Sequence, residues 1–329
     1  MRGNGHGGAQ RRVVVWVPGI AASIGDMALI GRDFPPTLAV TVLAAGALAA
    51  GGCGSDPEAP PGSLASGPVD IIASDTASSR DPLPFWGEAG CAARRRASRV
   101  REGGDTHRTA SGAKQRDSAF RRLTVVDGDD AYGERCELGL NDWRTGRTVF
   151  YREGRRVDTY LSLRLPSNYP LEESSWQVVM QMKQTQPSNN GGGTPALALE
   201  ASGGRWRLTR SASAGASGDS SELWSAPART GFWTRFALDA VYSRSAQRGS
   251  IAVHADLNGD GDFEDEGERS GVLRGFTLKR ETQGSLRGFA PGSSIPAHLR
   301  AGIYHDPAIP CPAPAGCSVD LDNVQVVAR

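Results

Sequence analysis

Beyond Phe120, apolar and polar residues alternate in short stretches that are separated by clusters of turn-forming residues. Alternation with a period of two is typical of β-strands, because successive side chains of a strand point to opposite faces. No stretch keeps a helical period over three turns, and no internal repeat is present. The pattern therefore predicts an all-β sandwich or barrel. The clearest expected strands are residues 159–165, 176–184, 206–210, 233–242, 250–256 and 318–327.

Three of the expected strands combine an apolar face with a polar one. The apolar faces hold Cys136, Leu138 and Leu140; Trp176, Val178, Met180 and Met182; and Leu299, Ala301 and Ile303. The polar faces hold Arg135 and Glu137; Gln177, Val179, Gln181 and Lys183; and His298, Arg300, Gly302 and Tyr304. An antiparallel sheet with one solvated side gives the same alternation, so this pattern alone does not identify a binding surface.

The first 119 residues differ in texture from the rest of the chain. Residues 37–53 are apolar, rich in small residues and too short for a membrane span, and they end at Cys53. They resemble a bacterial lipoprotein signal with Cys53 as the lipidated residue, although a plain secretory signal would lead to the same compartment. Residues 54–119 are rich in Ser, Pro, Gly, Ala and Arg, which is typical of a disordered linker. We therefore expect a signal over 1–53 (with an over-extended start), a low-complexity linker over 54–119 and a β-domain over 120–329.

The net charge of the chain is informative about its binding partners. The 329-residue chain holds 37 basic and 36 acidic residues, so no net field favours nucleic acid or a membrane surface. We expect a monomer that contacts the membrane only through an N-terminal lipid anchor.

The cysteines support export. Four remain besides Cys53, and an even number in an exported chain predicts disulfides. A bond between Cys311 and Cys317 would close a short loop, and one between Cys91 and Cys136 would tie the linker to the domain. A zinc site would need closer pairs and neighbouring histidines, which the sequence lacks.

An acidic, glycine-rich segment follows the expected strand 250–256. Oxygen-bearing side chains at alternate positions with Gly261 at the sixth match a calcium-binding loop, and they come from Asp256, Asn258, Asp260, Asp262 and Glu264. The twelfth position is Gly267 instead of glutamate, and a simple acidic hairpin is the alternative. If calcium binds, we expect a structural role; no organic cofactor is expected.

Three short motifs on the polar faces occur in a familiar order. Residues 135–138 (Arg-Cys-Glu-Leu) resemble the Arg-x-Glu-Leu motif of jelly-roll polysaccharide lyases. Residues 181–183 (Gln-Met-Lys) occupy the place of their Gln-x-His strand, and residues 300–304 (Arg-Ala-Gly-Ile-Tyr) resemble their late Lys/Arg-x-Gly-x-Tyr strand. The region from Phe120 to Arg329 is thus similar to alginate, glucuronan and heparin lyase I-like enzymes, most of all to the last group. The resemblance implies a concanavalin-like β-jelly-roll sandwich.

The resemblance also implies β-elimination in an acidic polysaccharide, at a uronic acid. A base removes the proton beside the carboxylate, and the glycosidic oxygen leaves from the neighbouring carbon. Gln181 and Arg135 would stabilise the charge that develops on the carboxylate, and Tyr304 would be the general acid and could also serve as the base. Glu137, Arg300 and His305 are expected to contact the substrate.

The departure from the family pattern is Lys183, which stands where the lyases have a catalytic histidine. A lysine acts as a base only when its pKa is lowered, so the sequence favours Lys183 as a neutraliser of the carboxylate and His298 or His305 as the base. The alternatives are a non-catalytic carbohydrate-binding module on the same fold and a structural lipoprotein of the cell envelope.

Overall fold

The computed structural model describes residues 70–77, 80, 86–101, 103–108, 114–116, 119–142, 147–149, 151–184, 194–211, 220–279 and 294–329. The expected export signal, Cys53 and the beginning of the expected linker lie outside these residues. Across the ranges just given, no helix has the length and apolar character needed to cross a membrane.

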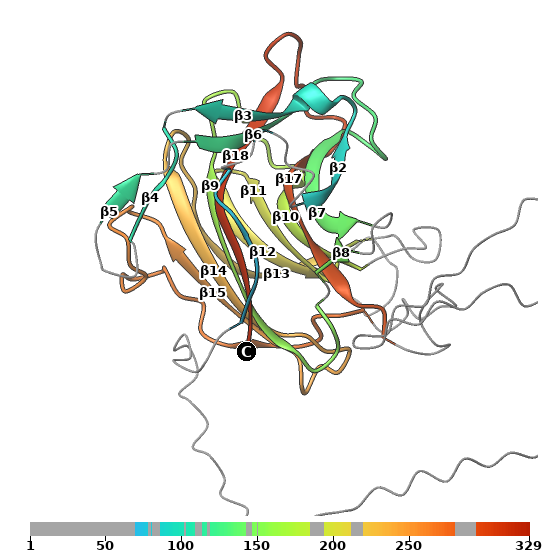
Figure 1. The fold of residues 1–329 in the computed structure, drawn as a ribbon, viewed down its shortest axis with the longest axis vertical. Helices are drawn as coiled ribbons and strands as arrows, with labels where there is room; N and C mark the ends of the chain where they lie inside the picture. The colour runs from blue at the N-terminus through green and yellow to red at the C-terminus, as the bar shows by residue number, and fades with distance from the viewer. Residues whose placement is uncertain are drawn as a thin grey trace, which may run out of the picture. The chain divides into compact units, whose positions relative to one another are not determined.

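Two antiparallel sheets lie one on the other (Figure 1). The site sheet runs, in spatial order, β13 (Ser220–Pro227), β12 (Arg205–Ser211), β11 (Leu197–Ser202), β10 (Gln177–Gln184), β17 (Ala297–His305), β7 (Arg135–Asp142) and β2 (Gly87–Cys91), with β8 (Arg147–Thr148) paired to β7. The outer sheet runs β16 (Leu273–Arg274), β15 (Ser250–Asp256), β14 (Trp233–Val241), β9 (Arg156–Arg164), β18 (Cys317–Ala328), β6 (Ala119–Val125) and β3 (Ala97–Arg101), with β1 (Asp70–Asp75) paired to β18. A small hairpin of β4 (Thr106–Arg108) and β5 (Lys114–Arg116) stands apart from both sheets.

The strand pattern read from the sequence is confirmed, and the fold is a concanavalin-like jelly-roll sandwich. Apolar side chains from alternate positions of both sheets fill the space between them, as period-two alternation requires. One contact across the interior is made by Trp206 of β12 and Phe236 of β14, whose rings meet edge to face with centroids 5.1 Å apart. The core holds the two sheets face to face, so the outward side of each sheet is left for polar groups.

The expected domain boundary at residue 120 is corrected by the structure. β1, β2 and β3 lie within residues 54–119, yet they pair with β18, β7 and β6 respectively. The sequence conceals them because β2 and β3 are edge strands, which bury little apolar surface and therefore carry small and basic residues. Trp86 anchors this region: its ring is fully buried, and its Nε1 donates to Asp75 Oδ2 at 2.7 Å.

Residues 103–105 also belong to the domain, since they cross the outward side of the outer sheet. The Asp105 carboxylate accepts hydrogen bonds from Ser162 on β9 and Arg235 on β14, each at 2.8 Å. The Asp105 amide donates to Asp322 on β18 at 3.0 Å. Three neighbouring strands are thus joined by one residue of the expected linker.

Both disulfides expected from the cysteine spacing are present. Cys91–Cys136 joins the paired positions of β2 and β7, and Cys311–Cys317 closes the turn between β17 and β18. The first bond ties an edge strand to the strand that carries Arg135 and Glu137. A strand that would otherwise depend on five residue pairs is therefore held covalently beside the polar face.

Candidate functional site

The three motifs meet on the outward side of the site sheet. β17 lies between β10 and β7, so residues from three distant parts of the chain become neighbours. Gln181 pairs with Arg300 and Lys183 pairs with His298 across β10 and β17, while Arg135 pairs with Tyr304 across β7 and β17. Paired residues point to the same face, and this face therefore gathers six of the predicted residues: Arg135, Gln181, Lys183, His298, Arg300 and Tyr304.

The Tyr304 ring is held from two sides. The Arg135 guanidinium lies over the ring, 3.6 Å from its centroid. The Trp176 ring meets Tyr304 edge to face, with centroids 4.7 Å apart. The backbone of Gly133 lies so close that a Cβ there would come within 3.2 Å of the Tyr304 ring. These contacts limit the rotamers of the proposed acid and hold its hydroxyl in one place.

Glu137, which the sequence predicts as a substrate contact, is a buried partner of the other site residues. Only 1 % of its surface is exposed. Its Oε1 accepts from Gln181 Nε2 at 2.6 Å, and its Oε2 lies 3.3 Å from Arg135 Nη1 and 3.9 Å from Arg300 Nη1. The sequence assigned Glu137 to substrate binding because alternation shows the face of a side chain and not its depth. One buried carboxylate thus orients the amide and both guanidinium groups.

His298 is buried and bonded in a way that does not suit a base. The Arg300 Nε donates to His298 Nε2 at 3.2 Å, so the lone pair of that nitrogen is occupied. His298 Nδ1 is buried and finds no hydrogen-bond partner in the part of the chain that the structure describes. Burial lowers the pKa of His298 well below its ordinary value, and the charges of Arg300 and Lys183 lower it further. The neutral ring therefore orients Arg300.

Lys183 has the exposure and the lowered pKa that suit a base, the role for which the sequence favoured His298 or His305. Burial lowers the pKa of its amine to about 8, with Arg300, Arg135 and Lys279 lowering it and Glu137 opposing them. The side chain is partly exposed, unlike that of His298. A lysine with this pKa is partly neutral near pH 8 and can accept a proton there.

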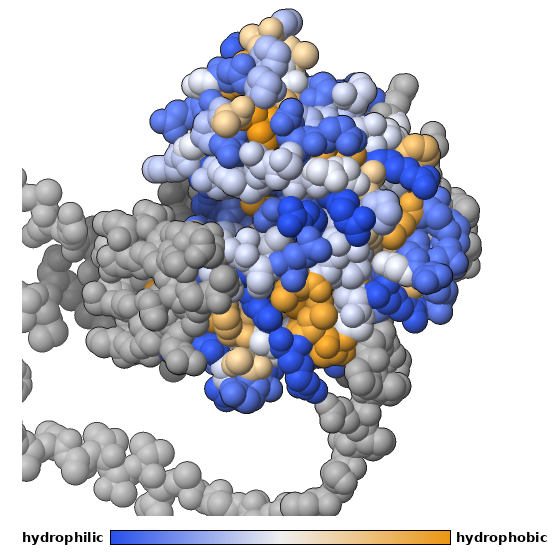
Figure 2. Space-filling model, turned by 180° about the vertical axis from the view of Figure 1, so that it is seen from behind, coloured by the Kyte–Doolittle hydropathy of each residue, from blue (hydrophilic) through white to orange (hydrophobic). Residues whose placement is uncertain are grey.

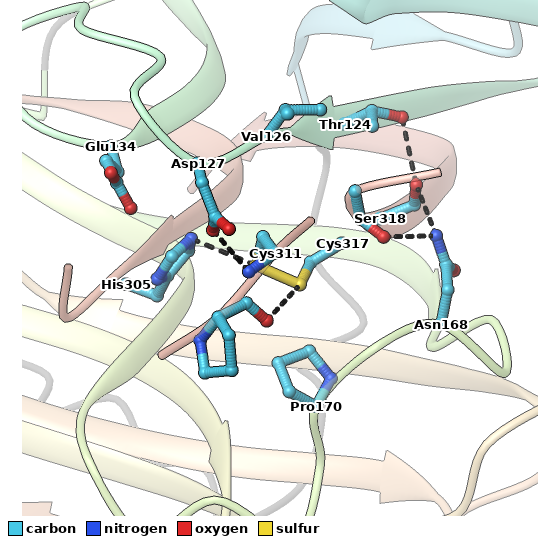
Figure 3. The surroundings of a disulfide bond; sticks show 12 residues. Thr124, Val126, Asp127, Glu134, Asn168, Pro170, His305, Cys311, Cys317 and Ser318 are labelled. Carbon is cyan, nitrogen blue, oxygen red and sulfur yellow. Dashed lines mark hydrogen bonds between the residues drawn. A yellow bond between two sulfur atoms is a disulfide. The ribbon is translucent and has the colours of Figure 1, made fainter. Parts of the chain in front are cut away.

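His305 does not join the site, which corrects its predicted role. Figure 3 shows its ring beside the Cys311–Cys317 disulfide, with Nε2 3.4 Å from Cys311 Sγ. Its Nδ1 donates to the Asp306 carbonyl at 2.8 Å, and the side chain is fully buried. Alternation along β17 explains the difference, because Tyr304 points to the polar face and the next residue points away from it.

Two aromatic residues at the site were not assigned to it from the sequence. Trp176 was placed on the core face with Val178. A register shift between Val178 and Met180 puts Val179 and Met180 both in the core and leaves Val178 opposite Tyr304. Upstream of the shift the alternation is reversed, so Trp176 stands beside Tyr304. Tyr132 lies in the turn before β7; an aromatic residue directly before Gly133 in an acidic turn was the only signal.

The predicted calcium loop joins β15 to the loop before β16. Asp256 is buried, and its carboxylate accepts from the amides of Gly259 and Gly261 at 2.6 and 3.0 Å. Asn258, Asp260 and Asp262 each accept from the amide two residues later. Among the residues that the structure describes, no three His, Cys, Asp or Glu side chains are grouped closely enough to hold a metal ion. Calcium binding here stays a prediction.

The chain is similar to several proteins of known structure. No curated protein matches the chain. Among solved structures, an endo-β-1,4-glucuronan lyase from the fungus Trichoderma reesei aligns with 69 % of this chain and 95 % of its own, at 14 % identity and a TM-score of 0.42. An alginate lyase from Pseudomonas aeruginosa aligns with 69 % of this chain and 87 % of its own, at 14 % identity and a TM-score of 0.39. The catalytic domain of a glycoside hydrolase family 131 protein from Coprinopsis cinerea also aligns, at 10 % identity and a TM-score of 0.35, covering 64 % of this chain and 70 % of its own.

The family comparison is more specific than the structural one. The family described as "Polysaccharide lyase" matches residues 87–315, a range that includes the three motifs, the Cys91–Cys136 disulfide and the edge strand β2. This range also begins inside the expected linker, in accordance with the corrected boundary. The chain belongs to the polysaccharide lyase family.

Proposed function

We propose that this protein cleaves a uronate-containing polysaccharide by β-elimination, with Lys183 as the base and Tyr304 as the acid. The observation that carries the proposal is the array around Glu137, in which one buried carboxylate orients Gln181, Arg135 and Arg300 beside Lys183 and Tyr304. The two guanidinium groups of Arg135 and Arg300 against one buried carboxylate leave an excess of positive charge even when Lys183 is neutral, which suits an anionic sugar.

Gln181 and Arg135 are suited to neutralise the uronate carboxylate. Gln181 donates one amide hydrogen to Glu137, which orients the amide, and Arg135 keeps a buried Nε with no partner among the described residues. Buried donors without partners are rare in folded proteins and are common where a ligand completes the site. As charge develops on the carboxylate, donors already in position stabilise it without reorganisation.

In the proposed reaction, Lys183 accepts one proton and Tyr304 donates one. The neutral Lys183 amine takes the proton from the carbon that bears the carboxylate, and the electron pair forms the double bond to the neighbouring carbon. The bond from that carbon to the glycosidic oxygen breaks, and the Tyr304 hydroxyl gives its proton to the leaving oxygen. One product carries an unsaturated uronate, and the other carries a new hydroxyl end.

A non-catalytic glycan-binding module is the second candidate, and the lysine at position 183 is the observation that favours it. Such a module would keep Arg135, Gln181 and Tyr304 as contacts, and it would need no base. Replacement of Lys183 by arginine separates the two functions, because arginine keeps the positive charge but does not release its proton near neutral pH.

The finer assignments are also part of this proposal. The overall texture of the sequence favours the heparin lyase I-like group within the family. The two disulfides are typical of a protein exported to an oxidising compartment, and the segment ending at Cys53 favours a lipid anchor at the cell surface. A structural calcium ion in the loop 256–264 and a monomeric state complete the proposal.

The direct test uses the ultraviolet absorbance of the unsaturated uronate across glucuronan, heparin, alginate and chondroitin. We expect a rise with at least one of them, and a loss of about 10²- to 10⁴-fold in Tyr304→Phe with glycan binding intact. Binding to a glycan without any rise in absorbance would favour the module. The absence of both would contradict both functions.

A further inference from the structure

Tyr132 combines an exposed aromatic ring with a left-handed backbone, and its role in the fold does not require that combination. Its side chain is 89 % exposed, the highest value among the large apolar or aromatic side chains exposed on the described surface. Figure 2 shows the hydropathy of one face, where apolar residues form separate patches among hydrophilic ones. The backbone of Tyr132 has φ +67°, in the left-handed region that bulky residues rarely adopt.

The position of Tyr132 relates this strain to the site. Its carbonyl oxygen accepts a hydrogen bond from Arg135 Nη2 at 2.5 Å, and the next residue, Gly133, packs under the Tyr304 ring. The turn therefore serves the site through its backbone, which any residue could provide. Asparagine or glycine would adopt this φ more easily, so the exposed aromatic ring is not explained by the turn itself.

Trp176 is a second exposed aromatic residue near Tyr304. Its side chain is 38 % exposed although it packs against Tyr304. Tyr132 precedes β7, Tyr304 lies on β17 and Trp176 precedes β10, so the three aromatic residues belong to three adjacent strands of the site sheet.

We propose that Tyr132 and Trp176 form a stacking subsite for a pyranose ring of the glycan, beside the bond that is cleaved, and that this subsite favours glucuronate over guluronate. The inference rests on the proposed function for the position of the cleaved bond. The negative face of an aromatic ring attracts C–H groups, so it binds a sugar face that carries axial C–H bonds. Glucuronate has equatorial hydroxyls and presents such faces, whereas the axial hydroxyls of guluronate interrupt them.

The decisive variant is Tyr132→Asn in the full chain, measured with glucuronan. Asparagine accepts the left-handed backbone and keeps the carbonyl that binds Arg135, but it removes the ring. We expect KM to rise about two- to tenfold with kcat nearly unchanged, and a melting temperature that does not fall. Trp176→Ala should also raise KM, and it should lower kcat as well because it removes a contact that holds the Tyr304 ring. The control Phe232→Ala, which removes an exposed ring from the turn before β14 of the outer sheet, should leave KM unchanged.

An unchanged KM in Tyr132→Asn, or equal KM values for glucuronan and guluronate-rich alginate in the wild-type protein, would overturn the proposal. If the protein proves not to cleave glucuronan, calorimetric titration with glucuronan tests the subsite separately. A weaker affinity of Tyr132→Asn would then support the subsite without the lyase reaction. Equal affinities of variant and wild type, or no binding by the wild type, would contradict it.

Discussion

At the scale of single residues, Lys183, and not His298, is suited to act as the base of the proposed reaction. The sequence offered both, and the general preference for histidine as a base favoured His298. The structure places His298 behind Arg300, with its Nε2 occupied, and places the amine of Lys183 among three other cationic side chains. Whether Lys183 or His298 can accept a proton depends on the burial and the neighbours of each side chain. Neither can be inferred from the alternation of residues along the chain.

A first prediction concerns pH. Because the pKa of Lys183 is lowered to about 8, the neutral amine becomes the main form only above that value. We expect kcat/KM to rise with pH up to about 8 and then to level off until another group titrates. Initial rates measured between pH 6 and 10, at constant ionic strength, check this. A rate that is already at its plateau at pH 6 would instead favour His298 as the base, because its pKa is lowered well below the ordinary value of about 6.5.

A second prediction concerns the stability that this lysine costs. Its folded-state pKa, about 8, lies below the ordinary value of 10.5, so between these pH values the unfolded chain binds more protons. The cost is fully present below about pH 8 and disappears as pH rises through 10.5. Lys183→Met should therefore abolish activity and leave the melting temperature at pH 7 unchanged or higher. A large fall in melting temperature would show that Lys183 mainly stabilises the fold.

Lys183→Arg separates charge from basicity at the same position. We expect a loss of about 10²-fold or more in kcat, while binding of the glycan is retained. Retention of near wild-type turnover would show that position 183 needs only a positive charge, and the base would then be sought at Tyr304.

At the scale of elements, the close pairing of β17 with β7 depends on Gly302. It has φ +150°, and a Cβ there would come within 2.2 Å of the Cys136 carbonyl oxygen and 2.8 Å of Glu137 Cα. Both atoms belong to β7, directly beside the carboxylate that organises the site. The glycine in the motif therefore permits the contact between the strand carrying Tyr304 and the strand carrying Arg135.

Gly302→Ala should lower the free energy of unfolding by about 1–3 kcal/mol and reduce activity as well, because the two strands must move apart. The matched control is Gly90→Ala on the neighbouring strand β2. A Cβ there would meet its nearest atoms at 3.6 and 3.9 Å, which is ordinary contact. Thermal or urea unfolding of both variants gives the comparison, and equal effects would contradict the steric explanation.

Calcium binding by the acidic loop after β15 can be tested separately. The sequence predicts that calcium raises the melting temperature and that Asp260→Asn removes this increase. Asp256 already closes the turn through two backbone amides, so the loop can hold its shape without an ion. A melting temperature that is the same in calcium and in chelator would leave these hydrogen bonds as the explanation for the acidic residues.

At the scale of the whole molecule, the sandwich, both disulfides and the three motif strands could be predicted from the sequence, since alternation and cysteine spacing are local signals. The early strands could not be predicted, because residues such as those of β3 are polar and their pairing with β6 is not visible locally. Three functional details were also hidden. The depth of Glu137, the direction of His305 and the approach of Trp176 to Tyr304 all depend on contacts between distant segments.

The corrected boundary leads to a prediction about truncation. A chain that begins at residue 120 loses β1, β2, β3, the buried Trp86 and one half of the Cys91–Cys136 bond. We expect this chain to be insoluble or to melt without a cooperative transition. A chain that begins at residue 70 should unfold cooperatively, as circular dichroism would show. Cooperative unfolding of the shorter chain would restore the boundary at residue 120.

The register shift in β10 has a consequence for two neighbouring valines. Val178 lies on the side of Tyr304, whereas Val179 is in the core. The alternation of inward and outward side chains is therefore reversed between the two halves of the strand. The register shift cannot be recognised in the sequence, because Val178, Val179 and Met180 are all apolar. A scan based on alternation would rank Val178→Asn as the harmful substitution and Val179→Asn as the harmless one. We expect the reverse: Val179→Asn should lower the melting temperature more than Val178→Asn.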